Sequence, residues 1–273
     1  MLELLVKLFG QVRTYMLSER YKRSQVYGQF AGHTTMVFDR EAEDIIIKGL
    51  TESGLGFEVI TEERASFSTR PSPPYRIVID PVDGSTNIMR GITTAGVSLA
   101  VLPIDAPISP EQVQWALVGE LFSGTIYQAE RGSGALCNGE RCHVSETTQL
   151  QDCLAGVNFD GRDLEMLWKL FAISPPLSKV RRTGSSALDI VYVASGAYDA
   201  YIDIGDVITA ESFLASSSIV LAAGGVVSDQ HGKSLRHITN LTEGFSLVAA
   251  GTRELHEAIL ERCFNPRRDD AAI

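Results

Sequence analysis

The sequence predicts an α/β (α+β) protein built from an N-terminal helical part, a strand-rich middle and an alternating C-terminal part. Apolar residues recur at helical spacing near the N-terminus, and short β-rich runs follow between residues 57 and 129. After about residue 148, helical and extended segments alternate. The 273 residues, 44% of them hydrophobic, are enough for a sizeable core. We therefore expect two subdomains, residues 1–148 and 149–273.

The first 20 residues are expected to form an amphipathic helix. Leu2, Leu5 and Phe9 fall at helical spacing, which suits packing on the protein or on a second subunit. Glu3 and Lys7 interrupt the apolar run, so this segment is expected neither to span a membrane nor to act as a secretion signal.

Most of the remaining elements follow from hydrophobic period and turn chemistry. A helix is expected over 40–50, with Asp39 as its N-terminal cap and glycines beyond its end. The expected strands of the first subdomain are 57–61, 75–80, 96–103, 113–119 and 124–129, followed by an Asn138-Gly139 hairpin turn. In the second subdomain we expect helices at 163–172, 185–196, 209–225 and 256–263, and strands within 179–184, 197–203 and 225–234.

Charge and cysteine content exclude several classes of protein. With 34 acidic and 24 basic residues the net charge is −10, and no basic block is present. A protein that binds nucleic-acid phosphates should show the opposite charge, so we expect no nucleic-acid partner and no membrane partner. Four cysteines do not make a disulfide framework at this length, and Cys137, Cys142 and His143 offer only a loose zinc spacing. Free thiols in a reducing cytoplasm are the expectation.

The stretch VIDPVDGSTN, residues 78–87, is the main candidate for a functional site. Asp80 ends a hydrophobic strand, and Asp83 can fold back towards it over the intervening proline. Gly84 allows a close backbone approach, and Ser85 begins a run whose N–H groups and hydroxyls suit an anion. Carboxylates on one side and anion donors on the other are typical of a phosphate site that holds Mg²⁺.

The same stretch is also compared with two other kinds of turn, an ordinary surface turn and a calcium-binding loop. Asp-Gly is common in surface turns, so the motif alone leaves an ordinary turn open. An EF-hand loop does not fit, because Val82 and Gly91 stand where that loop needs a polar ligand and a bidentate Glu.

Two further segments add to the candidate site. VITEER places Glu62 at the end of a neighbouring strand, where it would meet Asp80 and Asp83; three carboxylates in one place call for a cation. RRTGSSALDI, residues 181–190, opens a helix with Gly184, Ser185 and Ser186, a second possible anion site that also reads as a simple helix cap.

Taken together, these motifs resemble the inositol monophosphatase family, within the wider group that includes fructose-1,6-bisphosphatases. The order of VITEE, IDPVDGSTN, GSGALCNGERCHVS, TGSSALDIVYVASGAYDAYID and AAGGVVSD spreads the resemblance over most of the chain. It implies a layered αβαβα sandwich, a homodimer, and Mg²⁺-dependent hydrolysis of a small phosphorylated sugar or inositol, with inositol-1-phosphate and fructose-1,6-bisphosphate as leading substrates.

The resemblance also implies roles for individual residues. The implied metal ligands are Glu62, Asp80, the Val82 carbonyl and Asp83. The implied catalytic residues, around a metal-activated water, are Ser85, Asp39 and Glu62. The implied substrate-binding residues are Asp83, Gly84, Ser85, Gly184, Ser185, Ser186 and Asp203.

One position departs from the family pattern. A further Asp that binds metal is usual at the start of the helix ending in Ala-Gly-Gly, and here that position is Ser212. Glu211 is adjacent, although its side chain leaves the helix about 100° away from position 212, and Asp206 is another candidate. The second metal is therefore expected to bind weakly, to bind through Glu211, or to be absent.

The departure keeps more than one function open. The first hypothesis is an active Mg²⁺-dependent phosphomonoesterase. The alternatives are a catalytically impaired member that binds sugar phosphates or a protein partner, and a 3′-phosphonucleotide phosphatase with the same fold.

Overall fold

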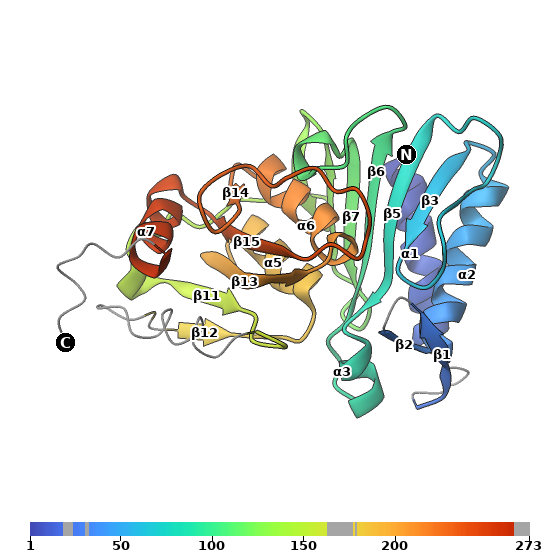
Figure 1. Cartoon of the computed structure of the whole chain (residues 1–273), viewed down its shortest axis with the longest axis horizontal. Helices are drawn as coiled ribbons and strands as arrows, with labels where there is room; N and C mark the ends of the chain where they lie inside the picture. Colours follow the sequence, from blue (N-terminus) through green and yellow to red (C-terminus); the bar gives the residue numbers. More distant parts are fainter. Residues whose placement is uncertain (19–23, 31–32, 163–176, 178, 265–273) are drawn as a thin grey trace.

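Five layers follow one another across the molecule in the order αβαβα (Figure 1). The computed structural model describes all residues except 19–23, 31–32, 163–176, 178 and 265–273. Helices α1 (Leu2–Met16) and α2 (Val37–Glu52) form the first layer and an eight-stranded sheet the second. Helices α5 (Ser186–Ala194) and α6 (Ala210–Ala222) separate this sheet from a five-stranded one, and α7 (Arg253–Phe264) covers its outer face. The predicted fold class is confirmed.

The first helix is shorter than predicted, and the second begins earlier. Helix α1 ends at Met16 rather than near residue 20. The apolar face of the helix ends there, since the next residue, Leu17, is 49% exposed. Helix α2 begins at Val37, so Asp39 is not its cap. The Asp39 carboxylate instead accepts the Met36 N–H at 3.0 Å from within the first turn, which satisfies one of the unpaired N–H groups of the helix start.

The eight-stranded sheet comes entirely from the first half of the chain. Its order is β10-β9-β8-β7-β6-β5-β3-β4. The strands are β3 (Phe57–Thr61), β4 (Phe67–Ser68), β5 (Tyr75–Asp83), β6 (Gly96–Pro103), β7 (Trp115–Glu120), β8 (Ile126–Glu130), β9 (Gly134–Cys137) and β10 (Glu140–Arg141). Strands β3 and β5 run parallel with Thr61 opposite Ile79, which brings their carboxyl ends to one edge.

The five-stranded sheet has the order β12-β11-β13-β15-β14. Its strands are β11 (Leu154–Val157), β12 (Lys179–Arg181), β13 (Ala200–Ile208), β14 (Val226–Ser228) and β15 (Phe245–Ala250). The sequence did not predict β11 or β15, and it ended the strand at β13 too early. The expected helix 163–172 lies outside the described residues. The division into two subdomains at residue 148 remains a proposal.

Several short elements complete the chain. Strands β1 (Val26–Phe30) and β2 (His33–Met36) form a hairpin that the polar sequence did not indicate. The one-turn helices η1 (Pro110–Gln112) and η2 (Leu150–Asp152) lie in connections, and α3 (Ser85–Arg90) follows β5. The Asn138-Gly139 turn is confirmed, since Cys137 pairs with Glu140 and both turn residues have positive φ. Among the described helices, none has both the length and the unbroken apolar character needed to cross a bilayer.

Two glycine substitutions test how α1 packs against the eight-stranded sheet. A Cβ on Gly119 in β7 would lie 2.4 Å from the Phe9 ring, so Gly119→Ala is expected to destabilise the chain by about 1–3 kcal/mol. A Cβ on Gly10, in the same helix as Phe9, would meet no heavy atom within 4 Å, and Gly10→Ala should stabilise by about 0.5–1 kcal/mol. Urea unfolding of both variants measures the difference; equal effects would contradict this packing.

Candidate active site

A strand, a tight turn and a short helix position the carboxylates of the IDPVDGSTN motif. Strand β5 continues through Asp83, and the Val82 N–H donates to Asp80 Oδ1 at 3.1 Å. Gly84 has φ of +104°, and a Cβ there would approach the Thr94 carbonyl at 3.2 Å. Only glycine therefore suits this turn, after which α3 begins at Ser85.

Asp83 joins this turn to the start of α5. Its Oδ2 accepts from Ser185 Oγ at 2.7 Å and from the Ala187 N–H at 2.5 Å. Gly184 has φ of +87° and lies against Asn87, whose Nδ2 donates to the carbonyls of Thr94 and Thr183 at 2.8 Å each. The two segments that the sequence proposed as anion sites thus meet across the two halves of the chain.

Ser85 and Asp39 form the contact that their proposed shared role requires. Ser85 Oγ lies 2.7 Å from Asp39 Oδ1 and 2.9 Å from the Val82 carbonyl oxygen. Asp39 is 2% exposed, and this burial, partly opposed by the hydrogen bond from Ser85, raises the pKa of Asp39 to about 7. The carboxyl group is therefore partly protonated near neutral pH.

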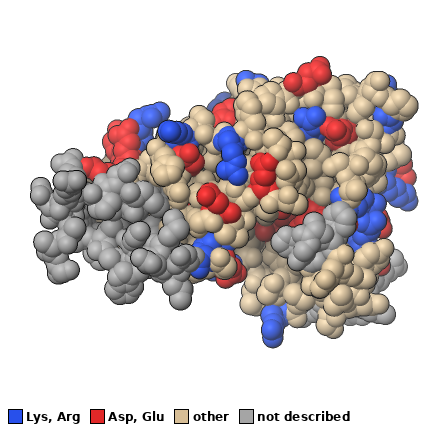
Figure 2. All heavy atoms as spheres, in the orientation of Figure 1, with Lys and Arg blue, Asp and Glu red and all other residues tan. Residues whose placement is uncertain are grey.

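Four carboxylates crowd together at the carboxyl ends of β3 and β5. Burial, and then repulsion from Glu211, raises the pKa of Glu62 well above its usual value. The pKa of Asp80 is raised by burial and by the charges of Glu62 and Asp83, and burial also raises the pKa of Asp83. Several buried carboxylates so close together are unfavourable in their ionised form unless a cation binds between them. On the drawn face of the molecule as a whole, acidic and basic side chains are interspersed (Figure 2).

The carboxylates do not yet converge on one point. In the described part of the chain, no three His, Cys, Asp or Glu side chains are gathered as a metal centre. Glu62, Asp80, Asp83 and the Val82 carbonyl would hold a divalent cation only with further ligands from backbone carbonyl groups or water, which Mg²⁺ commonly uses.

Glu211 and Ser212 lie beside this group, whereas Asp206, the other candidate for the missing metal ligand, does not. Helix α6 begins at Ala210, and Glu211 is 4% exposed with no hydrogen-bond partner for Oε2 among the described residues. Thr209 Oγ1 donates to its other oxygen, Oε1, and burial raises the pKa of Glu211 to about 7. Ser212 Oγ lies 3.5 Å from Asp80 Oδ2. Asp206 points elsewhere, accepting from Ser246 Oγ at 2.8 Å.

Asp203 lies in a closed ionic network. It is fully buried, and Arg162 forms an ion pair with it, with Nε donating to Oδ1 at 2.8 Å. Asn158 Nδ2 donates to Asp203 Oδ2 at 2.9 Å, and the Tyr201 hydroxyl does so at 3.2 Å. Contact between Asp203 and a substrate hydroxyl would require this network to open.

Sequence reasoning missed the arginines that hold the site together. Arg64 pairs with the buried Glu43 and with Asp44, while Arg40 donates to the Glu63 carbonyl at 3.0 Å; these contacts anchor the segment that carries Glu62. Arg182 lowers the pKa of Asp83 as a nearby positive charge, in opposition to the larger effect of burial. Basic residues beside such motifs follow no fixed spacing, so the sequence alone did not reveal these arginines.

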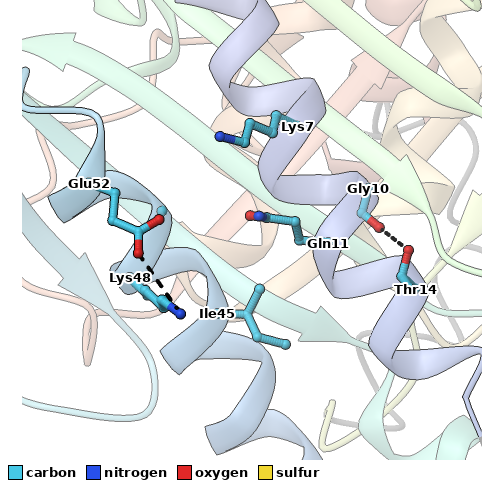
Figure 3. Close-up of a pocket in the computed structure, with 8 residues that line it drawn as sticks. Lys7, Gly10, Gln11, Thr14, Ile45, Lys48 and Glu52 are labelled. Atoms are coloured by element: carbon cyan, nitrogen blue, oxygen red, sulfur yellow. Dashed lines mark hydrogen bonds and ion pairs between the residues drawn. The ribbon is translucent and has the colours of Figure 1, made fainter.

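Two hollows differ in what they offer. A cavity of about 340 Å³ is lined by residues 60–62, 64–66, 108, 209, 211 and 238–242, and it reaches Glu62 and Glu211. A second hollow of about 460 Å³ lies between α1 and α2, where Lys48 faces Glu52 at 3.9 Å (Figure 3). The first adjoins the carboxylate group, and the second is part of the outer helix layer.

Comparisons with known proteins agree with this fold and show the family of the chain. The model of the inositol monophosphatase family matches residues 5–264. A fructose-1,6-bisphosphatase/inositol-1-monophosphatase of Methanothermobacter thermautotrophicus is 33% identical over 236 residues, 84% of this chain and 83% of that protein. A putative Nus factor SuhB of Neisseria meningitidis serogroup B is 32% identical and covers 81% of each chain.

The solved structure of an inositol monophosphatase-fructose 1,6-bisphosphatase superimposes with a TM-score of 0.80 at 26% identity, covering 95% of this chain and 98% of that one. The family match and the names of these relatives make the chain a phosphoric monoester hydrolase. The chain belongs to the inositol monophosphatase family.

Proposed function

We propose that this chain hydrolyses inositol-1-phosphate, fructose-1,6-bisphosphate or both, with Mg²⁺ as its cofactor. The observation that carries the proposal is the crowding of Glu62, Asp80 and Asp83, with raised pKa values, directly beside the start of α3. The names of the relatives support the substrate class.

The donor set suits a hard divalent cation. Glu62, Asp80, Asp83 and the Val82 carbonyl offer oxygen ligands only, and Glu211 and Ser212 flank them. Oε2 of Glu211, which has no hydrogen-bond partner among the residues that the structure describes, is a buried acceptor of the kind that a cation satisfies. When bound, Mg²⁺ would acidify an attacking water and neutralise charge on the phosphate oxygens.

The chain's own residues would bind the phosphate and receive the proton. The first N–H groups of a helix have no intrahelical acceptor, so Gly84 and Ser85 at the start of α3 can donate to phosphate oxygens. Ser85 Oγ can take up a proton from the attacking water as it passes its own to Asp39 Oδ1, which holds it because the pKa of Asp39 is about 7. Gly184, Ser185 and Ser186 would line the opposite wall.

Phosphate release during a Mg²⁺ titration tests the proposal. We expect turnover of inositol-1-phosphate or fructose-1,6-bisphosphate at millimolar Mg²⁺ and none in EDTA. A 3′-phosphonucleotide included in the panel separates the same-fold alternative. Absence of metal-dependent release from every substrate would leave the phosphatase proposal without support.

One observation favours a second candidate, a family member with impaired catalysis that binds sugar phosphates or a protein partner. Ser212 cannot supply the charge of the Asp usual at its position, and one relative carries the name of a Nus factor. Saturable binding of a sugar phosphate without release of phosphate would support this candidate.

We also propose that the chain works as a cytoplasmic homodimer. The free thiols of Cys137, Cys142 and Cys153 fit a reducing compartment, and β1 presents Val26 and Tyr27, which are 56% and 62% exposed, as a possible subunit contact. Light scattering of the purified chain reports its oligomeric state.

A further inference from the structure

We infer that Glu211, and not Ser212, binds a second divalent cation, and that this cation lies between Glu211 and Glu62 on the floor of the 340 Å³ cavity. The inference rests on the proposed cation-dependent function and names the residue that replaces the missing Asp. It places the second cation on the Glu62 side of the carboxylate group.

The first support is the state of the Glu211 side chain. It is 4% exposed, and Oε2 has no hydrogen-bond partner within the described chain. Leaving a buried carboxylate oxygen unsatisfied is costly. Thr209 donates to Oε1, which fixes the group and leaves Oε2 as the available ligand atom.

The second support is the shape of the cavity. Glu62 and Glu211 come from different elements, the end of β3 and the first turn of α6, and both line this cavity, whereas Asp80 and Asp83 do not. A cation held between the two glutamates would have the open space of the cavity next to it. Mg²⁺ retains several water ligands, and 340 Å³ has room for them.

The remaining lining suits a hydrated cation. Thr239, Asn240 and Thr242 also line this cavity, and their polar groups are hydrogen-bonded to one another and to Glu243. The guanidinium of Arg64 is engaged by Glu43 and Asp44, so its charge is already largely balanced. Water bound to the cation would therefore meet acceptors and donors on the far wall.

Ser212 is already used in another way. Its hydroxyl lies 3.5 Å from Asp80 Oδ2, close enough to act as a weak donor that orients this carboxylate. A neutral hydroxyl adds no charge to compensate a cation. Glutamate at 211 is one methylene longer than aspartate, and from the first turn of α6 it reaches the same group of carboxylates.

Titration of the metal-free chain with Mn²⁺, followed by electron paramagnetic resonance of the free ion, tests the inference without any assay of activity. We expect two Mn²⁺ per native chain. Glu211→Gln should lose the second or weaken it at least tenfold, because one carboxylate is replaced by an isosteric amide. Ser212→Ala should keep both, and Thr209→Val should weaken the second site only.

Glu254→Gln provides the matched control, since Glu254 occupies the first turn of α7 as Glu211 does that of α6. Thermal unfolding without metal confirms that each variant folds. Two unchanged sites in Glu211→Gln, loss of the second site in Ser212→Ala, or a single site in the native chain would each overturn the inference while leaving the phosphatase proposal intact. A native chain that binds no Mn²⁺ would remove the basis of both.

Discussion

Replacing Asp83 with Asn should abolish phosphate release while leaving the chain folded. Asp83 lies at the meeting point of β5, α3 and α5, and its Oδ2 accepts from Ser185 Oγ and the Ala187 N–H. An Asn oxygen can still accept from these donors, so the junction is retained. The negative charge needed by a cation is lost, and we expect a decrease in kcat larger than the roughly 10–100-fold typical of residues one shell further out.

The comparison needs a control and an independent measure of folding. Asp105→Asn makes the same chemical change at an exposed position outside the motif and should leave turnover unchanged. Circular dichroism and the thermal midpoint of metal-free Asp83→Asn should match those of the native chain closely. An unaffected rate in this variant would remove Asp83 from the proposed mechanism.

The metal-free chain should lose stability as the pH rises from about 4 to 7, in contrast to most proteins. The pKa values of Asp39 and Glu211 are about 7, above their usual values. A carboxyl group with a raised pKa in the folded state stabilises it fully only below its unfolded pKa, and this contribution is lost as the pH rises through the folded value. The expected loss is on the order of a few kcal/mol, or roughly 5–15 °C in Tm.

Mg²⁺ should reverse this dependence, because a bound cation favours the ionised carboxylates. Differential scanning calorimetry at several pH values, with EDTA and with Mg²⁺, measures both curves. His256 acts in the opposite direction over part of this range: burial lowers its pKa, so its contribution to stability is lost as the pH falls below about 6.5. A metal-free chain whose stability rises between about pH 5 and 7 would contradict the buried-carboxylate account.

The strands with strong local signals were predictable. Phe57–Thr61 and Gly96–Pro103 were predicted with their observed bounds, because each is an apolar run bordered by turn or polar residues. Leu154–Val157 and Phe245–Ala250 were missed. Both lie in the interior of the second sheet and are defined by pairing with β13, which local sequence does not encode.

The placement of the candidate site residues was predictable where they lie in contiguous motifs. The parallel register of β3 and β5 brings Glu62 beside Asp80, as expected from strands that end at one edge. The surroundings of Glu211 and Asp203 could not be predicted from the sequence, because they depend on burial and on the hydrogen-bond and ion-pair partners Thr209 and Arg162. The side chains of positions 211 and 212 leave the helix in different directions, but Glu211 still reaches the carboxylate group. Its longer side chain and its place in the first turn of α6 make this contact possible.

The contact of Asp83 with Ser185 ties the two halves of the chain at the site itself. Asn87 adds a second tie through the Thr183 carbonyl, so separation of the halves breaks hydrogen bonds within the residues proposed to bind phosphate. A ligand that strengthens these contacts therefore slows local opening at the junction. Strand β6 and helix α5 lie on opposite sides of the boundary between the two halves. The rates at which their amide hydrogens exchange with solvent would then both depend on whether a ligand occupies this one site.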